Sequence, residues 1–149
     1  MTGRAHPAIT GVTMTREVQK MRPHLKMLCG NYPTFDIISQ QSGGSSKCRL
    51  CTNLCESTEH LISQCPKFDS LRAQIKSEMN SICEKSNIKI NVNEFNNSEF
   101  TQYLLDPCSL NLRKRVNIND PALPQLYKLS RDFCYAIDKT RAKIIKPKC

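Results

Sequence analysis

A cluster of cysteines and one histidine between residues 48 and 65 limits what this chain can fold into more than any other feature. The segment reads Cys48-Arg-Leu-Cys51-Thr-Asn-Leu-Cys55-Glu-Ser-Thr-Glu-His60-Leu-Ile-Ser-Gln-Cys65. A Cys-x-x-Cys spacing lets one tight turn present two thiolates to a single ion, and three thiolates with an imidazole form the closed tetrahedral set that structural Zn²⁺ takes. Soft sulfur ligands disfavour Mg²⁺ and Ca²⁺. The sequence therefore predicts a Zn²⁺ site whose ligands are Cys48, Cys51, His60 and Cys65.

A second ligand set stays open because Cys55 lies inside the same segment. Replacing Cys48 by Cys55 gives the quartet Cys51, Cys55, His60 and Cys65, whose spacing resembles a zinc knuckle. We favour Cys48 because Cys-x-x-Cys is the tighter chelate and leaves room before the next helix. A third interpretation treats the cysteines as buried or disulfide-linked residues beside a surface histidine.

The local pattern around His60 predicts how it meets Cys65. Ser57 or Thr58 can cap a short helix, and His60 then lies in its first turn. On an unbroken α-helix Cys65 would point elsewhere, but Pro66 disfavours helical geometry at the residue before it. We therefore expect the helix to end at Cys65 and the chain to bend this thiol back toward the metal.

Apolar residues recur at helical spacing through most of the remaining chain, which indicates a mostly α-helical fold. An irregular zinc-binding module should lie between the helices. Predicted helices cover residues 13–28, about 66–85, 98–105 and about 121–145, and Pro23 should kink or split the first. Residues 40–46 form a Gly/Ser linker, and the Asn-rich residues 87–97 are a loop or one short strand. The expected divisions are a flexible N-terminus (1–12), a helix plus linker (13–47), the zinc-binding module (48–66) and a helical C-terminal region with Asn-rich and basic loops (67–149).

The cysteine count bears on the compartment. The chain has nine cysteines, an odd number, and residues 1–7 show no apolar stretch of the kind a secretory signal needs. A secreted disulfide scaffold is therefore disfavoured, and we expect a reducing intracellular compartment, either nucleus or cytoplasm. No apolar run approaches the ~18 residues that a membrane span requires, so no membrane association is expected.

The charge distribution favours a polyanionic partner. Lys and Arg number 22 against 13 Asp and Glu, for a net charge of +9, and the excess lies on both sides of a neutral middle segment. Basic flanks of this kind favour RNA or DNA, although they also serve simply to keep a chain soluble. The residues expected to contact phosphates are Arg113, Lys114, Arg115, Arg141 and Lys143.

The cysteine motif resembles the zinc-binding region at the C-terminal end of reverse transcriptases from non-long-terminal-repeat retrotransposons. In that family two cysteines precede a Glu-Thr/Ser-x-x-His turn, a Cys-Pro pair closes the site, and an arginine follows a few residues on. The matching residues here are Cys48, Cys51, Glu56-Ser-Thr-Glu-His60, Cys65-Pro66-x-Phe68 and Arg72. Flanking segments resemble the family as well, at residues 25–32, 100–107 and 131–137. The resemblance implies a zinc-binding tail that accompanies a polymerase.

Polymerase activity is not expected from this chain. Polymerisation needs paired aspartates that hold two metal ions, and the sequence contains no Asp-Asp pair. We expect a detached tail that acts as a non-catalytic zinc-binding module and associates with nucleic acid through its basic flanks. The alternative is a zinc-stabilised structural or protein-interaction fragment that binds no nucleic acid. A thiol enzyme using Cys51 or Cys55 is disfavoured because zinc-bound thiolates are poor nucleophiles, and the sequence leaves the oligomeric state open.

Overall fold

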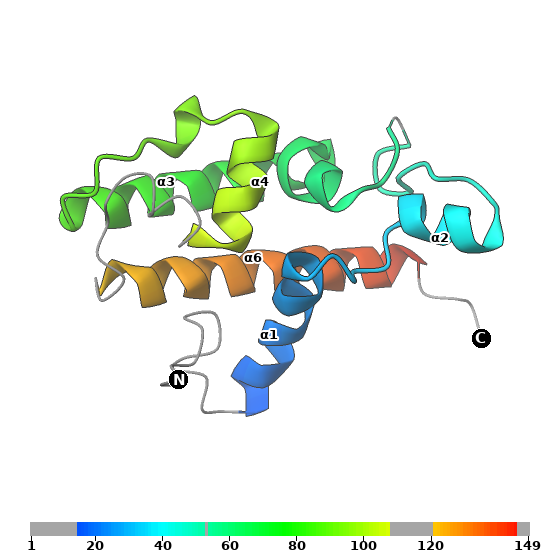
Figure 1. The fold of residues 1–149 in the computed structure, drawn as a ribbon, viewed down its shortest axis with the longest axis horizontal. Coiled ribbons are helices and arrows are strands. Elements are labelled where there is room, and N and C mark those ends of the chain that lie inside the picture. Colours follow the sequence, from blue (N-terminus) through cyan, green and yellow to red (C-terminus); the bar gives the residue numbers. More distant parts are fainter. Residues whose placement is uncertain (1–14, 53, 108–120, 146–149) are drawn as a thin grey trace, which may run out of the picture.

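Helices supply nearly all regular structure in the computed structural model, which describes residues 15–52, 54–107 and 121–145 (Figure 1). Within these ranges the β-type pairing is a single antiparallel bridge between Lys47 and Cys55. The predicted mostly α-helical fold is therefore confirmed. In chain order the elements are α1 (Thr15–Leu28), α2 (Phe35–Ser42), the π-helical turn η1 (His60–Gln64), the 3-10 turn η2 (Pro66–Phe68), α3 (Asp69–Lys85), the 3-10 turn η3 (Val92–Glu94), α4 (Asn97–Leu105) and α6 (Ala122–Ile145).

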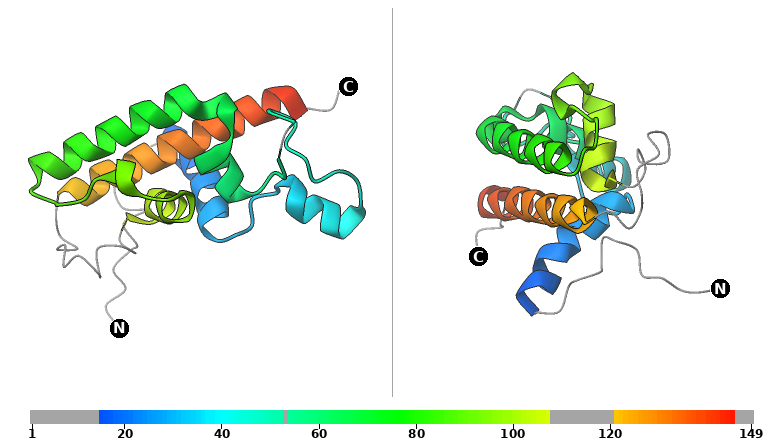
Figure 2. Two further views of the ribbon diagram at one scale, coloured as in Figure 1. Left: turned by 90° about the horizontal axis from the view of Figure 1, so that it is seen from above. Right: turned by 90° about the vertical axis from the view of Figure 1, so that its left-hand side faces the viewer.

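The longest of the described helices, α6, is the element against which three other helices pack. It contacts α1, α3, α4 and the π turn η1. Figures 1 and 2 show α3 running alongside α6 in the opposite direction, while α1 crosses α6 steeply. The loop that carries the cysteines lies beyond the end of this helical stack, next to α2 and the C-terminal end of α6.

Burial explains why these segments are helical. On α3 the side chains of Ile75, Met79 and Cys83 recur every four residues and are all buried, so one stripe of the helix faces the core. Burying such a side chain contributes about 1.5–3 kcal/mol, which is more than helix propensity alone supplies. The largest fully buried side chains include four aromatic residues of the helical core, which are Phe100, Tyr103, Tyr127 and Phe133.

Several helix ends carry capping signals that are visible in the sequence. Asn96 and Glu99 form a reciprocal capping box at the start of α4. Pro66 begins a 3-10 turn that leads into α3. Gly30 has a φ of +74° just after α1, a conformation that glycine adopts without strain. The expected flexible N-terminus, residues 1–12, lies outside the described residues.

Two local expectations need correction. Pro23 does not split the first helix, because α1 continues through it to Leu28. The linker expected from residue 40 begins later, since α2 extends to Ser42. Residues 87–97 contain the short turn η3 and no strand before α4 begins, so the expected Asn-rich loop is confirmed over the alternative of a short strand. The Val92 amide donates to the Asn80 side chain at 3.0 Å, which replaces the hydrogen bond a neighbouring strand would have supplied.

None of the described helices combines the length and the apolar character needed to cross a bilayer.

Candidate metal centre

The first two cysteines lie in a narrow loop that its own backbone holds closed. The Cys48 amide donates to the Leu54 carbonyl and the Thr52 amide donates to the Cys48 carbonyl, each at 2.8 Å. Thr52 has a φ of +61°, which lets the chain reverse sharply after Cys51. The loop, residues 46–56, is called the cysteine loop below. Its turn holds the Cys48 and Cys51 side chains on the same side, as the Cys-x-x-Cys spacing predicts.

The other two residues of the cluster are separated by one π turn. Ser57 caps this turn by accepting a hydrogen bond from the His60 amide at 3.0 Å, and the Cys65 amide closes it by donating to the His60 carbonyl at 2.7 Å. A π turn closes between residues five apart rather than four, so Cys65 returns to the side of the turn on which His60 lies. Cys65 itself is extended, with φ −62° and ψ 120°, as expected for a residue that precedes proline.

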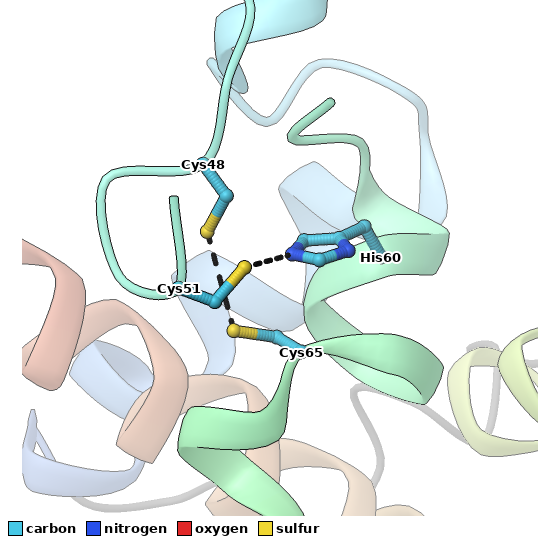
Figure 3. Close-up of side chains that lie close together, drawn as sticks. All are labelled: Cys48, Cys51, His60 and Cys65. Atoms are coloured by element: carbon cyan, nitrogen blue, oxygen red, sulfur yellow. Dashed lines mark hydrogen bonds between the residues drawn. The ribbon is translucent and has the colours of Figure 1, made fainter. Parts of the chain in front are cut away.

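These two segments bring four side chains together. One ligand atom from each of Cys48, Cys51, His60 and Cys65 lies within 4.8 Å of the others (Figure 3). The Sγ atoms of Cys48 and Cys65 are 4.0 Å apart, and Cys51 Sγ is 3.4 Å from His60 Nε2. In a tetrahedral zinc site with ordinary bond lengths the corresponding separations are about 3.8 Å and about 3.6 Å. The donor set therefore fits a metal ion.

The structure also separates the two competing quartets. Cys55 is exposed and lies outside the cluster, whereas Cys48 is buried within it. The bridge between Lys47 and Cys55 pairs the two backbones across the cysteine loop. Side chains alternate along paired backbone. Cys48, one residue further along, is thus placed toward the metal position and Cys55 is not.

Burial disfavours the charged forms of three residues of the cluster in the absence of metal. It raises the pKa of the Cys65 thiol to about 12 and also raises the pKa of Cys48, because a thiolate loses its hydration there. Burial lowers the pKa of His60, which favours the neutral imidazole that a metal ion requires. A bound cation reverses this preference for the two thiols by stabilising their thiolates.

Arg72 fastens the end of the π turn. Its buried guanidinium donates to the carbonyls of Ile62 at 2.8 Å and Cys65 at 3.0 Å, and it pairs with Asp69 at 2.6 Å. The last carbonyls of a helical turn lack partners within that turn, so this arginine satisfies the buried Ile62 carbonyl. The Cys65 carbonyl also accepts from the Phe68 amide at 3.1 Å, and Arg72 is its second donor. The family resemblance pointed to Arg72, but periodicity and spacing did not indicate its contacts.

Glu56 and Arg141 form a buried ion pair that sequence reasoning missed. Glu56 has no exposed surface, and Arg141 is 8% exposed. The Arg141 Nη2 atom donates to Glu56 Oε1 at 2.8 Å, and Nε lies 3.1 Å from both carboxylate oxygens. No local signal in the sequence links residues this far apart. The placement of Arg141 in a phosphate-binding surface is therefore wrong, because its guanidinium is buried and already bound.

The remaining residues of the expected nucleic-acid surface have different outcomes. Lys143 lies on the last turn of α6 and is exposed, as a phosphate contact would require. Arg113, Lys114 and Arg115 lie outside the described residues. Exposed lysines alone do not define a binding surface, so nucleic-acid binding stays a prediction.

Comparison of the chain with protein-family models, with curated proteins and with solved structures finds no match. The description of its class therefore depends on the fold and the site alone. Together they define a mostly α-helical protein in which a largely buried Cys3His cluster, placed between helices, has the geometry to hold one metal ion.

Proposed function

We propose that this chain is a non-catalytic zinc-binding module in which one Zn²⁺ stabilises the fold. The observation that carries the proposal is the convergence of three thiols and one imidazole within 4.8 Å at a largely buried position. Sulfur-rich tetrahedral sets select Zn²⁺ over the harder divalent ions Mg²⁺, Ca²⁺ and Mn²⁺. Because zinc binding to such sites is coupled to folding, the metal would contribute directly to stability.

A structural role suits this ligand set better than a catalytic one. Catalytic zinc sites supply three protein ligands and leave a fourth position for water or substrate, whereas four protein ligands close the tetrahedron. Cys48, His60 and Cys65 are each at most 1% exposed, so a substrate would have no approach to the ion from their side.

We further propose that the chain is a tail of the kind found in non-long-terminal-repeat reverse transcriptases. The support is the motif itself together with the use that this fold makes of its residues. The Cys65-Pro66 pair ends the π turn, and the matching arginine, Arg72, binds the carbonyl of Cys65. Association with nucleic acid would then depend on the net charge of +9 and on exposed lysines such as Lys143.

The competing function is a zinc-stabilised structural or protein-interaction fragment. The buried ion pair of Arg141 and Glu56 favours this structural function, because Arg141, one of the five residues proposed for phosphate binding, is buried and already paired. Retention of the protein on single-stranded nucleic acid at about 50 mM salt, with loss as salt rises, separates the two functions.

The zinc proposal is tested by metal analysis of the purified chain. We expect one zinc per chain after reconstitution. Replacement by Co²⁺ should give the intense visible absorption of tetrahedral thiolate coordination. A chain that folds fully and binds neither metal would contradict the proposal.

A further inference from the structure

The carboxylate of Glu56 lies where the cysteine loop, the start of α2 and the end of α6 meet. It accepts a hydrogen bond from the Phe35 amide at 3.0 Å and the ion-pair contacts from Arg141. Carboxylates are almost never fully buried unless they are paired, and Glu56 satisfies this condition with partners from two other elements. The Glu56 carboxylate therefore fixes the end of the cysteine loop relative to the start of α2 and to the end of α6.

The backbone of Glu56 strengthens the same junction. Its amide donates to the Ser46 carbonyl at 2.8 Å, which closes the base of the cysteine loop. Its carbonyl accepts from the Asp36 amide at 3.0 Å, which attaches that base to the first turn of α2. A shift of the cysteine loop would therefore break contacts on the side chain and the backbone of Glu56 together.

Arg141 binds the junction from the opposite side. Its Nη2 atom donates to the Pro33 carbonyl at 2.7 Å, and its guanidinium lies over the rings of Tyr32 and Phe35 at 5.3 Å and 5.1 Å. The Phe35 ring also receives Arg49 at 4.5 Å. Arg49 lies between the two ligands of the Cys-x-x-Cys turn, so that turn contacts the same aromatic ring as the C-terminal end of α6.

We propose that Glu56 and Arg141 are positioning residues of the metal centre. Their ion pair clamps the cysteine loop to the C-terminal end of α6. Metal binding at the cluster and the ordering of the C-terminal end of α6 therefore depend on each other. This inference rests on the proposed zinc site and adds a coupling between that site and a residue distant in sequence. Neither residue is one of the four that form the metal-binding cluster. Their effect comes from holding Cys48 and Cys51 in place against His60 and Cys65.

The physical reason for the coupling is the cost of leaving a buried charge without its partner. When the cysteine loop moves without metal, Glu56 moves with it and Arg141 keeps a buried guanidinium that has lost its carboxylate. The end of α6 would then be driven toward solvent. Since linkage is reciprocal, whatever frees Arg141 must also weaken metal binding.

The first test measures zinc affinity of the full chain by competition with a chromophoric chelator. We expect Glu56→Gln and Arg141→Gln each to weaken zinc affinity by about 10- to 100-fold, the range seen when groups that orient metal ligands are removed. In the double variant the loss of binding free energy should be smaller than the sum of the losses in the two single variants, because both substitutions remove the same interaction. Glu94→Gln and Lys128→Gln, which remove exposed charges from η3 and α6, should leave the affinity unchanged.

The second test needs no variant and follows amide hydrogen exchange with and without zinc. We expect zinc to slow exchange at residues 138–144, near the clamp, and to change residues 126–133 of the same helix much less. Zinc binding with wild-type affinity in both single variants, or zinc protection confined to residues 46–65, would overturn the clamp while leaving the zinc site intact. Failure of the wild-type chain to bind zinc would overturn the proposed function itself.

Discussion

His60 and Cys65 lie on one π turn, and the hydrogen bond of 2.7 Å from the Cys65 amide to the His60 carbonyl closes it. At 3.6 residues per turn, an α-helix would place two residues of this spacing about 140° apart around its axis. The wider turn removes most of that separation and gives a single ion access to both side chains. Single π turns occur frequently at functional sites, and here the turn has a direct use.

The ligand assignment predicts unequal effects of cysteine substitution. Cys48→Ser and His60→Ala should abolish stoichiometric zinc binding, because each removes one of the four ligands that complete the tetrahedral site. Cys55→Ser should retain one zinc per chain, since Cys55 is exposed and outside the cluster. Metal analysis after gel filtration measures all three. Loss of zinc in Cys55→Ser with retention in Cys48→Ser would identify the other quartet as the ligands.

Removing the guanidinium of Arg72 should destabilise the protein and its π turn. Arg72→Ala leaves the buried carbonyl of Ile62 without its donor, whereas the Cys65 carbonyl keeps the Phe68 amide, so we expect a loss of about 1–3 kcal/mol in the free energy of unfolding. Urea titration of the zinc-loaded protein measures this change. The control is Lys67→Ala, which truncates an exposed cation five residues earlier and should change stability by less than about 0.5 kcal/mol. Equal stability of the two variants would show that water replaces the arginine.

The apolar stripe of α3 should carry much of the stability of the helical stack. Ile75 is buried, so Ile75→Asp places an unpaired charge in the core and should cost about 3–5 kcal/mol. Ser77→Asp adds the same charge to an exposed position of the same helix and should be nearly neutral. Thermal unfolding followed by circular dichroism compares the two. An unchanged melting temperature in Ile75→Asp would mean that α3 does not pack on α6 in solution.

Metal-free protein should be most stable in a window around neutral pH. The raised pKa values of Cys48 and Cys65 mean that their contribution is complete below the ordinary thiol value of 9.0 and is lost as pH rises through the folded values. The lowered pKa of His60 acts in the opposite direction. Its contribution is present above the ordinary value of 6.5 and is lost as pH falls through the folded value.

This window is checked by urea titrations of chelator-treated protein at pH values of about 5.5, 7.5 and 10. We expect the highest free energy of unfolding at the middle value. Cys65→Ala should reduce the alkaline loss, because the thiol with a pKa of about 12 is then absent. A free energy that rises steadily with pH above 9.0 would contradict the burial of these thiols in the metal-free state.

Nucleic-acid association, which is proposed and not established, makes a prediction about salt. If Arg113, Lys114 and Arg115 all contact phosphates, neutralising them together should reduce the slope of log affinity against log salt by about two to three units. Fluorescence anisotropy with a labelled single-stranded oligonucleotide measures the slope. Absence of binding by the wild-type chain at about 50 mM salt would favour the structural alternative.

Much of the fold was predictable because the signals behind it are local. Helical spacing of apolar residues placed α1, α3, α4 and α6 to within a few residues but did not predict α2. Pro66 together with Cys65 indicated where the chain leaves the π turn. The preferred ligand set was predictable for the same reason, since all four residues lie in one short segment. The type of turn was not, because hydrophobic periodicity does not distinguish a single π turn from an α turn.

What the sequence did not reveal depends on contacts between distant residues. Arg141 lies among other basic residues and was assigned to the surface with them. Only the folded chain shows that it faces Glu56. The Asn80 side chain that binds the Val92 amide is a similar case. The composition of residues 87–97 was compatible with a loop or a short strand, and this hydrogen bond from outside the segment belongs to the loop.

The contacts within the metal cluster join residues close together in the sequence, and the clamp joins residues far apart. This difference has a consequence for the order of folding. Cys48 and Cys65 are 17 residues apart, whereas Glu56 and Arg141 are 85 residues apart. Closing the longer loop costs about 1.4 kcal/mol more entropy, and short-range contacts form faster. During synthesis the ribosome also releases the cysteine loop well before residue 141. Zinc capture should therefore be an early step in the maturation of this chain, and closure of the Glu56–Arg141 clamp one of the last.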